Sequence, residues 1–493
     1  MPGFAAAIPC RPLVGACRPV AWPRDPAALF AGLADKRGCV WLDSAGGPAG
    51  LGRWSVLAAE PSAVLVGRRG VTRLEAADGG VIAESGRNPF EVLRECLIAS
   101  RIGGGGDSRL PFGPGLYGYL SYDLAPYVEP KAGLSPRDDI VLPHLWFGLY
   151  EAVLVFDHLS RQAFIVGGAS AAGEAIEEAL AVHVAVRRGG YGDPPRYAYH
   201  EPVVRDVACN MSREQFCQAV AKAREYIAAG DIYQVNLSRR YTVSVAPAGV
   251  SGGPRWPDLY LRLRQANPAP YAAYIDVGGG AAILSSSPEL FLDLRGGRVI
   301  TRPIKGTRPL RPGDEAANNL AREALIRSEK DRAELTMIVD LERNDLGRVS
   351  EYGSVRVTEP RAVEAYAAVY HTVATVEGRL HAGRDVVDLL KATFPGGSIT
   401  GAPKVRAMQI IAELEPTRRS VYTGAVGYLA PPSDGDPAGR CALNIAIRTL
   451  IASGDAVHVQ VGGGIVADSD PHAELEETSD KARAMLSALG LSP

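Results

Sequence analysis

The chain has 493 residues, enough for one large or two ordinary domains with a substantial core. Its 53 basic and 55 acidic side chains nearly cancel, so the composition indicates neither a nucleic-acid nor a membrane-surface partner. There is no apparent signal peptide, no apolar run long enough to span a bilayer, and no CxxC pair among seven scattered cysteines, so we expect a reduced, cytoplasmic protein without structural zinc.

The first 200 residues contain short apolar runs bounded by turn residues, a pattern typical of strands. Residues 53–57 and 63–66 are predicted to be paired strands. Residues 89–99 have the spacing of an amphipathic helix, and residues 103–108 form a predicted flexible loop. Further strands are predicted at residues 40–44, 149–156 and 163–167 and within residues 111–123.

A Gly/Pro-rich stretch at residues 187–202 marks the predicted boundary between two domains, residues 1–200 and 201–493. After it, Ser212 is the predicted N-cap of a helix that has Gln215 at the capping-box position and ends at Gly230.

A long helical pattern covers residues 314–338, and further helices are predicted to begin near Pro403 and Pro471. Strands are predicted between them, at residues 422–429 and 441–450. This mixture predicts an α+β fold with several hairpins and lacks the regular alternation of a doubly wound sheet.

The segment TRPIKGTRP, residues 301–309, places Lys305 directly before Gly306 and Thr307. Glycine lets a ligand approach the backbone, the threonine hydroxyl can donate and accept hydrogen bonds, and two prolines stiffen the segment. A rigid loop with a central amine suits holding an anion or attacking an electrophilic carbon. The alternative is a tight turn with a solvated lysine.

Two acidic pairs have the spacing of one helix face: Asp331 with Glu334, and Glu474 with Glu477. The second pair follows Asp470, a predicted N-cap. Carboxylates on two helix faces could hold Mg²⁺, which prefers oxygen ligands. The alternative for the second pair is simple stabilisation by the helix dipole.

Two glycine-rich segments, residues 395–404 and 462–464, could cradle an anion, although such turns are common. Arg448 is predicted on the polar face of the strand at residues 441–450. An arginine there is usually solvated, but it is also suited to a bidentate contact with a carboxylate.

Six motifs in order strongly resemble those of the chorismate-utilising enzymes, over most of the chain from residue 209 onward and more weakly before it. The motifs are GDIYQVNLS, SSSPE, PIKGT, MIVDLERNDLGRV, GGSITGAPK and GGGIVADSDPHAELEET. The resemblance implies an α+β fold of two intertwined α/β subdomains, with two packed, largely antiparallel sheets and helices outside.

The resemblance also implies Mg²⁺ as cofactor and chorismate as substrate. By motif position, Glu334 and Glu477 correspond to Mg²⁺ ligands, with Glu474 alongside. Asp331 has a shorter arm than the glutamate common at its position. Substrate-binding positions are matched by Gly306, Thr307, Gln234, Thr400, Gly401, Lys404, Tyr428, Arg448, Gly462, Gly463 and Gly464.

Within the family, Gln234 stands where water-adding members have a lysine base, so the chain resembles the members that use ammonia. Lys305 resembles the lysine of aminodeoxychorismate synthases, proposed to attack ring C2, where anthranilate synthases usually have alanine. Glu289 matches the acid that protonates the departing 4-hydroxyl. His371 aligns with a site histidine, the alternative being a core histidine satisfied by hydrogen bonds.

An ordinary lysine has a pKa of about 10.4, so a neutral Lys305 near pH 7 requires a shift of roughly three units, or about 4 kcal/mol. Partial burial and a nearby Mg²⁺ are expected to supply it.

No cysteine has the setting of a glutaminase nucleophile, so a separate glutamine amidotransferase subunit is expected to supply the ammonia. Ser44, Pro270 and Tyr271 lie in segments where relatives bind tryptophan, which makes them a possible tryptophan site.

The expected reaction is that of a transferase making 4-amino-4-deoxychorismate, the precursor of 4-aminobenzoate for folate. The alternative enzyme is an anthranilate synthase. A non-catalytic tryptophan-binding scaffold is the alternative from another class, and the intact Lys305, Glu289, Glu334 and Glu477 argue against it.

Overall fold

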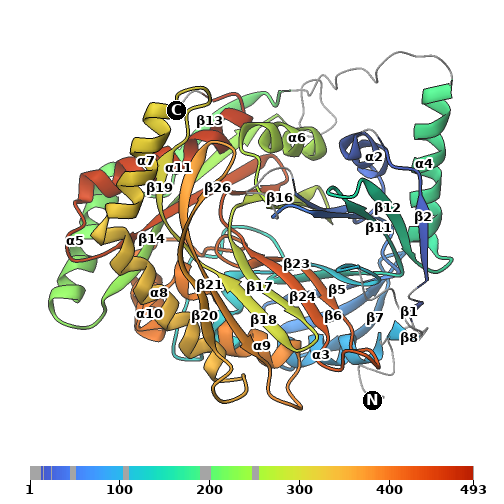
Figure 1. Ribbon diagram of the computed structural model, residues 1–493, viewed down its shortest axis with the longest axis horizontal. Coiled ribbons are helices and arrows are strands. Elements are labelled where there is room, and N and C mark those ends of the chain that lie inside the picture. The colour runs from blue at the N-terminus through green and yellow to red at the C-terminus, as the bar shows by residue number, and fades with distance from the viewer. Residues whose placement is uncertain are drawn as a thin grey trace.

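The computed structural model describes residues 13–14, 16–23, 25–44, 51–100, 102–103, 110–188, 201–246 and 255–491 (Figure 1). Residues 104–108 of the predicted loop, most of the predicted boundary at residues 187–202 and residues 45–47, which follow Ser44 of the possible tryptophan site, lie outside them.

Two twelve-stranded antiparallel sheets form the centre of the protein. In spatial order, the first sheet contains β19 (Ile304–Pro309), β21 (Val369–Arg379), β18 (Arg298–Arg302), β17 (Leu290–Arg295), β24 (Arg440–Ile445), β23 (Ala425–Ala430), β9 (Gly115–Leu120), β10 (Leu145–Tyr150), β5 (Ala63–Arg68), β6 (Val71–Ala76) and β7 (Val81–Ser85), with β20 (Arg356–Ala365) beside β21.

The second sheet is built in the same way from strands of both chain halves. It contains β13 (Val204–Cys209), β14 (Gln234–Val245), β26 (Ala456–Ile465), β25 (Thr449–Ser453), β16 (Ala281–Ser287), β15 (Tyr271–Gly278), β3 (Val40–Asp43), β4 (Trp54–Ala58), β11 (Ala152–Asp157), β12 (Gln162–Gly167) and β2 (Cys17–Val20), with β22 (Gly401–Ala402) beside β14. A separate parallel pair joins β1 (Leu13–Val14) to β8 (Ile102–Gly103).

Helices cover the outer faces of the two sheets (Figure 1). They are α2 (Pro26–Leu33), α3 (Pro89–Ala99), α4 (Ala171–Arg188), α5 (Arg213–Ala228), α6 (Trp256–Ala266), α7 (Glu315–Arg327), α8 (Glu329–Gly347), α9 (Val386–Thr393), α10 (Lys404–Leu414) and α11 (Pro471–Ala488), with short 3-10 helices η1 (Tyr122–Tyr127) and η2 (Gly397–Ile399). None of the helices in the described ranges is long and apolar enough to cross a membrane.

The two faces of each sheet belong to different hydrophobic cores, because successive strand side chains point to opposite faces. On β9, Tyr117 and Tyr119 enter the core between the sheets, while Leu116 and Leu120 enter the core beneath α3, α8 and α9. On the second sheet, the outer core is formed with α2, α4, α6 and α11. The expected fold of two packed sheets with helices outside is therefore confirmed.

Both sheets combine strands from either side of residue 200, so the two chain halves are intertwined. The division into domains 1–200 and 201–493 stays a prediction, since its boundary falls mostly outside the described residues.

The helix ends predicted from capping residues are observed in the structure. Helix α3 has the predicted bounds, and α5 begins with the predicted capping box, in which Ser212 and Gln215 exchange hydrogen bonds. Asp470 caps α11 by accepting from the backbone N–H groups of His472 and Ala473 at 3.0 and 2.9 Å.

The single helix predicted over residues 314–338 is wrong, because Ser328 divides it into α7 and α8. Ser328 leaves the helical conformation, with ψ 107°, and its Oγ accepts from Asp331 N at 3.1 Å. Serine favours such a cap over a helix interior.

Three strand predictions fail at crossings between the sheets. The runs at 53–57 and 63–66 do not pair, because β4 joins the second sheet and β5 the first. The run at 149–156 divides into β10 and β11 for the same reason, and the run at 441–450 divides into β24 and β25. Arg448, predicted on a strand face, lies in this last crossing with φ 52°.

Candidate active site

Lys305 lies on β19 at the edge of the first sheet, close to the end of β26 in the second. Its Nζ donates to the carbonyl of Ser398 in η2 at 3.5 Å. Burial lowers the pKa of Lys305, opposed by the negative charges of Glu334, Glu289 and Glu477. Burial, which disfavours the ammonium form, therefore outweighs the three carboxylates, which favour it.

Glu289 lies between β16 and β17, and its carboxyl group is affected by the charge of Lys305. Its side chain is 4% exposed, and burial raises its pKa to about 7, against the effects of the Ser398 hydroxyl and the Lys305 charge. A carboxyl group with this pKa is partly protonated at neutral pH, so it can donate a proton next to Lys305.

Glycines of β26 let these groups meet. A Cβ placed on Gly464 would lie 2.5 Å from Gln234 Nε2 and 3.5 Å from Lys305 Nζ. A Cβ on Gly463 would lie 3.1 Å from Glu474 Oε2 and 4.0 Å from Glu477 Oε1. The predicted glycine segment therefore joins the Lys305 side of the site to the acids of α11.

The acids of α8 and α11 lie close enough to affect one another, because the charge of Glu477 on α11 raises the pKa of Glu334 on α8. Burial raises the pKa of both Glu334 and Glu474. For Glu477, burial is outweighed by Lys481, whose ammonium lies 2.7 Å away, and the pKa of Glu477 falls below its ordinary value. Lys330 lies 3.9 Å from Glu334.

The donor set of Glu334, Glu474 and Glu477 fits Mg²⁺, which takes carboxylate oxygens together with water and substrate. Within the described part of the chain, no three of these acids bring oxygens within 4.8 Å of one another. Asp331 instead lies beside Gly306 and 3.4 Å from Arg308.

The side-chain amide of Gln234 lies beside Gly464 of β26. Its side chain is fully buried, yet neither Nε2 nor Oε1 has a hydrogen-bond partner among the residues that the structure describes. Buried polar groups are nearly always paired, so this amide is suited to a ligand group. Nearby, a Cβ on Gly401 would lie 2.2 Å from the backbone carbonyl oxygen of Gln234.

His371 and Arg448 complete the predicted site. His371 Nδ1 lies 3.0 Å from Thr307 Oγ1 and 3.4 Å from the Gly306 carbonyl. Burial, with the charge of Arg448, lowers the pKa of His371 to about 4, so the imidazole is neutral. Arg448 donates from Nη1 to the Lys481 carbonyl at 3.1 Å, which directs it toward α11.

Most of the chain is similar to known proteins. Residues 52–487 match the family described as chorismate binding enzymes. The chain belongs to this family.

Relatives with two different names are similar to the chain. It is 38% identical to aminodeoxychorismate synthase component 1 of Bacillus subtilis over 457 residues, which covers 92% of each chain. It is 44% identical to anthranilate synthase component 1 of Thermus thermophilus over 385 residues, which covers 78% of this chain and 79% of the relative. The crystal structure of anthranilate synthase component I from Streptococcus pneumoniae is 35% identical, with a TM-score of 0.72 over 88% of this chain and 92% of that one.

Two of the residues assigned to substrate in this chorismate-binding enzyme lie apart from Lys305 and its neighbours. Lys404 makes a buried ion pair with Asp345 at 2.5 Å and donates to the Thr393 carbonyl at 2.9 Å. Tyr428 lies between the sheets, with its ring centroid 4.6 Å from that of Tyr117. Their substrate contacts stay predictions, while the observed contacts of Lys404 are an ion pair and a hydrogen bond and that of Tyr428 is ring packing. Thr400 is fully buried and donates to the Gly396 carbonyl at 2.9 Å, so it holds the glycine loop.

Sequence reasoning missed Lys481. Its ammonium donates to the Gly462 carbonyl at 2.9 Å and pairs with Glu477, so it links the glycine segment to the acidic helix. The signal was present, because a lysine four residues after a glutamate lies on the same helix face. Ser398 and Ser469 were also missed, and Ser469 donates to Glu474 Oε1 at 2.7 Å.

The three residues of the possible tryptophan site lie together where β3 ends and β15 begins. Ser44 Oγ is 2.6 Å from the Trp54 carbonyl and 3.3 Å from that of Pro270. The next residue, Tyr271, accepts through its carbonyl from Asn444 at 2.7 Å. Tryptophan binding there stays a prediction.

Gly464→Ala is expected to lower kcat/KM for chorismate by roughly tenfold or more, about 1.4 kcal/mol of transition-state stabilisation. The new methyl group would press on the Gln234 amide and lie 3.5 Å from the Lys305 amine. The backbone of Gly464 is outside the left-handed region, so the melting temperature should change little. Gly435→Ala, whose added Cβ meets nothing within 4 Å, is the control. Equal kcat/KM for both variants would remove Gly464 from the site.

Proposed function

We propose that this chorismate-binding enzyme is aminodeoxychorismate synthase component I, which converts chorismate and ammonia into 4-amino-4-deoxychorismate, the precursor of 4-aminobenzoate for folate. The observation that supports it is the buried Lys305 amine beside Glu289, whose pKa of about 7 suits an acid. The relatives include synthases of both products at similar identity, so the proposal rests on this lysine. A cytoplasmic location is part of the proposal.

The anionic substrate is proposed to lie between β19, the end of β26 and the helices α8 and α11. Glu334, Glu477 and Glu474 would hold a Mg²⁺ ion, which supplies positive charge for one substrate carboxylate. Arg448 is suited to the other carboxylate because a guanidinium can bind it in a bidentate manner. Lys481 supports Arg448 through its backbone carbonyl.

The chemistry follows from an amine on β19 and an acid in the connection between β16 and β17. In this mechanism the neutral form of the Lys305 amine attacks ring C2 of chorismate, the two ring double bonds shift to C1=C6 and C4=C5, and the C4–O bond breaks. Glu289 protonates the departing oxygen, which leaves as water. Ammonia then forms a bond at C4, the double bonds shift back, and the C2–N bond to Lys305 breaks. The proton lost by the new amine returns to Glu289, so the enzyme is regenerated.

In this proposal His371 positions the backbone of Gly306 and Thr307, which follow Lys305. Its neutral ring is held between Thr307 and Tyr366, with ring centroids of His371 and Tyr366 4.8 Å apart. It therefore fixes the Gly306–Thr307 backbone that follows Lys305 and adds no positive charge that would oppose Lys305.

The isolated chain is expected to be inactive with glutamine and active with ammonium salts at alkaline pH, where more of the ammonium is present as ammonia. The reason is that no cysteine of the sequence has the setting of a glutaminase nucleophile. The measurement is product formation from chorismate with either nitrogen source. A separate glutamine amidotransferase subunit is proposed to restore glutamine use, and glutamine-dependent turnover by the chain alone would contradict this.

Anthranilate synthase component I is the second candidate, because relatives of that name are up to 44% identical. The two candidates differ in product: 4-amino-4-deoxychorismate retains the pyruvyl group, while anthranilate forms with its loss. Incubation with chorismate, Mg²⁺ and ammonium, followed by mass analysis, decides between them. Anthranilate as the main product would replace the proposed function.

A further inference from the structure

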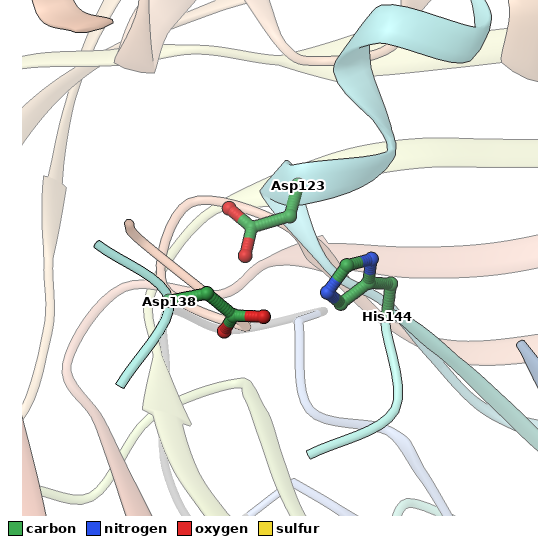
Figure 2. A group of neighbouring side chains, drawn as sticks. All are labelled: Asp123, Asp138 and His144. Atoms are coloured by element: carbon green, nitrogen blue, oxygen red, sulfur yellow. The ribbon is translucent and has the colours of Figure 1, made fainter. Parts of the chain in front are cut away.

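A second group of metal-type ligands lies away from Lys305, where η1 and β10 meet. Asp123 belongs to η1, Asp138 to the loop that follows, and His144 immediately precedes β10. One ligand atom from each lies within 4.8 Å of the others. Figure 2 shows the two carboxylates and the imidazole directed toward one another.

Two of these side chains are buried with polar atoms left unpaired. Asp123 is 2% exposed and His144 is 8% exposed. In the described part of the protein, Asp123 Oδ1 and His144 Nε2 have no hydrogen-bond partner. Each such atom costs about 1–3 kcal/mol when buried unpaired, so two of them at one place indicate a missing partner.

The ligands are held in place by backbone contacts from distant segments. The backbone N–H of His144 donates to Gly67 at 2.7 Å, and its carbonyl accepts from Ser121 at 2.7 Å. The loop that carries Asp138 is fixed by Arg418, which donates to the Ser135 carbonyl at 3.0 Å. The group is therefore rigid before any ligand binds, a requirement for a specific metal site.

Charges around the group leave Asp138 able to bind a cation. Arg418 and Arg69 lie 3.7 and 3.8 Å from Asp138, longer than hydrogen bonds, and the Arg69 side chain is 70% exposed.

A solvent path reaches the three side chains. They line a surface cleft of about 520 Å³ together with Tyr127, Leu134 and both arginines. An ion can enter through this cleft, and water from it can fill the remaining coordination positions.

We propose that Asp123, Asp138 and His144 form a second cation site for one first-row transition ion such as Zn²⁺ or Mn²⁺. One imidazole nitrogen and two carboxylates are donors that such ions accept, whereas Mg²⁺ prefers oxygen alone. The site is separate from the acids of α8 and α11, and the proposal does not depend on which product the enzyme makes.

The site is joined to the Gly-rich segment through Arg419, the neighbour of Arg418. The Arg419 guanidinium lies 4.9 Å from the ring of Tyr122, which precedes Asp123. It also donates to the carbonyls of Ile399 at 3.0 Å and Asn236 at 2.7 Å. Ion binding is therefore expected to stabilise the fold around the active site, since it favours the native state.

The test is calorimetric titration of the full chain with ZnCl₂ and, separately, MnCl₂ in excess Mg²⁺, which occupies the acids of α8 and α11. We expect one ion bound per chain and a melting temperature that rises with Zn²⁺ concentration. His144→Ala and Asp138→Asn should each lower the affinity by roughly tenfold or more. His381→Ala, which removes an exposed histidine elsewhere, should bind as the native chain does.

A spectroscopic readout keeps the test independent of stability. Cu²⁺ bound by the native chain in excess Mg²⁺ should show nitrogen hyperfine structure in its electron paramagnetic resonance spectrum, and His144→Ala should lose it while keeping the native circular dichroism. Absence of Zn²⁺ and Mn²⁺ binding beyond the Mg²⁺-occupied acids, or equal affinity and an unchanged nitrogen signal in His144→Ala, would overturn the proposal.

Discussion

Lys305→Ala should slow the formation of 4-amino-4-deoxychorismate by at least about 10³-fold, because it removes the proposed nucleophile rather than a supporting contact. In the proposed mechanism, Lys305 bound at ring C2 blocks attack by ammonia there and activates C4. Without the lysine side chain, C2 is open, and some anthranilate should form. The measurement is the ratio of the two products from chorismate and ammonia for the native chain and the variant.

Lys305→Arg separates a nucleophile from an electrostatic anchor. If Lys305 only anchored the substrate, it would contribute about 1–3 kcal/mol as a charged hydrogen bond, and arginine would retain much of the activity. A guanidinium stays protonated and cannot replace the attacking amine, so we expect an inactive variant. An active Lys305→Arg would reject only the covalent step. Lys222→Ala on α5, an exposed lysine paired with Glu225, is the control and should match the native chain.

Glu334→Ala and Glu477→Ala are each expected to abolish turnover without unfolding the protein. Each change removes an oxygen ligand, and the remaining acids would then repel the substrate carboxylates. A loss of at least about 10²-fold in kcat/KM, roughly 3 kcal/mol, is expected for each. The measurements are steady-state kinetics over a range of Mg²⁺ concentrations and thermal unfolding of the same samples.

A neighbouring glutamate provides the matched control for this experiment. Glu476 is adjacent to Glu477 on α11, but it pairs with Arg213 of α5, whereas Glu477 pairs with Lys481 beside the glycine segment. Glu476→Ala should therefore keep native kinetics. Near-native activity of Glu334→Ala or Glu477→Ala at saturating Mg²⁺ would reject the metal assignment.

Local chemistry explains which parts of the fold could be predicted. The capping box of Ser212 and Gln215 and the Asp470 cap are determined by residues within three positions of each other, and both are observed. The ordered motifs likewise place Lys305 where the charges of Glu334, Glu289 and Glu477 act on it.

Long-range partners could not be predicted in the same way. Alternation of apolar residues identifies β4 and β5 as strands, but it contains no information on which sheet each joins. The same limit applies to Arg448, whose crossing between sheets looks like continuous strand in the sequence. It also applies to Asp138 and His144, because their approach to Asp123 depends on where a loop and a strand end meet.

The pairing of β14 with β26 determines when the catalytic site can exist during synthesis. Val235 at the start of β14 pairs with Ile465, and the acids of α11 follow that strand. A nascent chain that still lacks α11 has Lys305 and Glu289 but neither Glu477 nor Lys481. Both sheets also contain strands from the C-terminal part of the chain, β23 and β24 in the first and β25 and β26 in the second. Contacts between residues far apart in the sequence must therefore form after most of the chain has left the ribosome. Chorismate can therefore meet an assembled site only after α11 has been synthesised, and deletion of α11 is expected to remove activity.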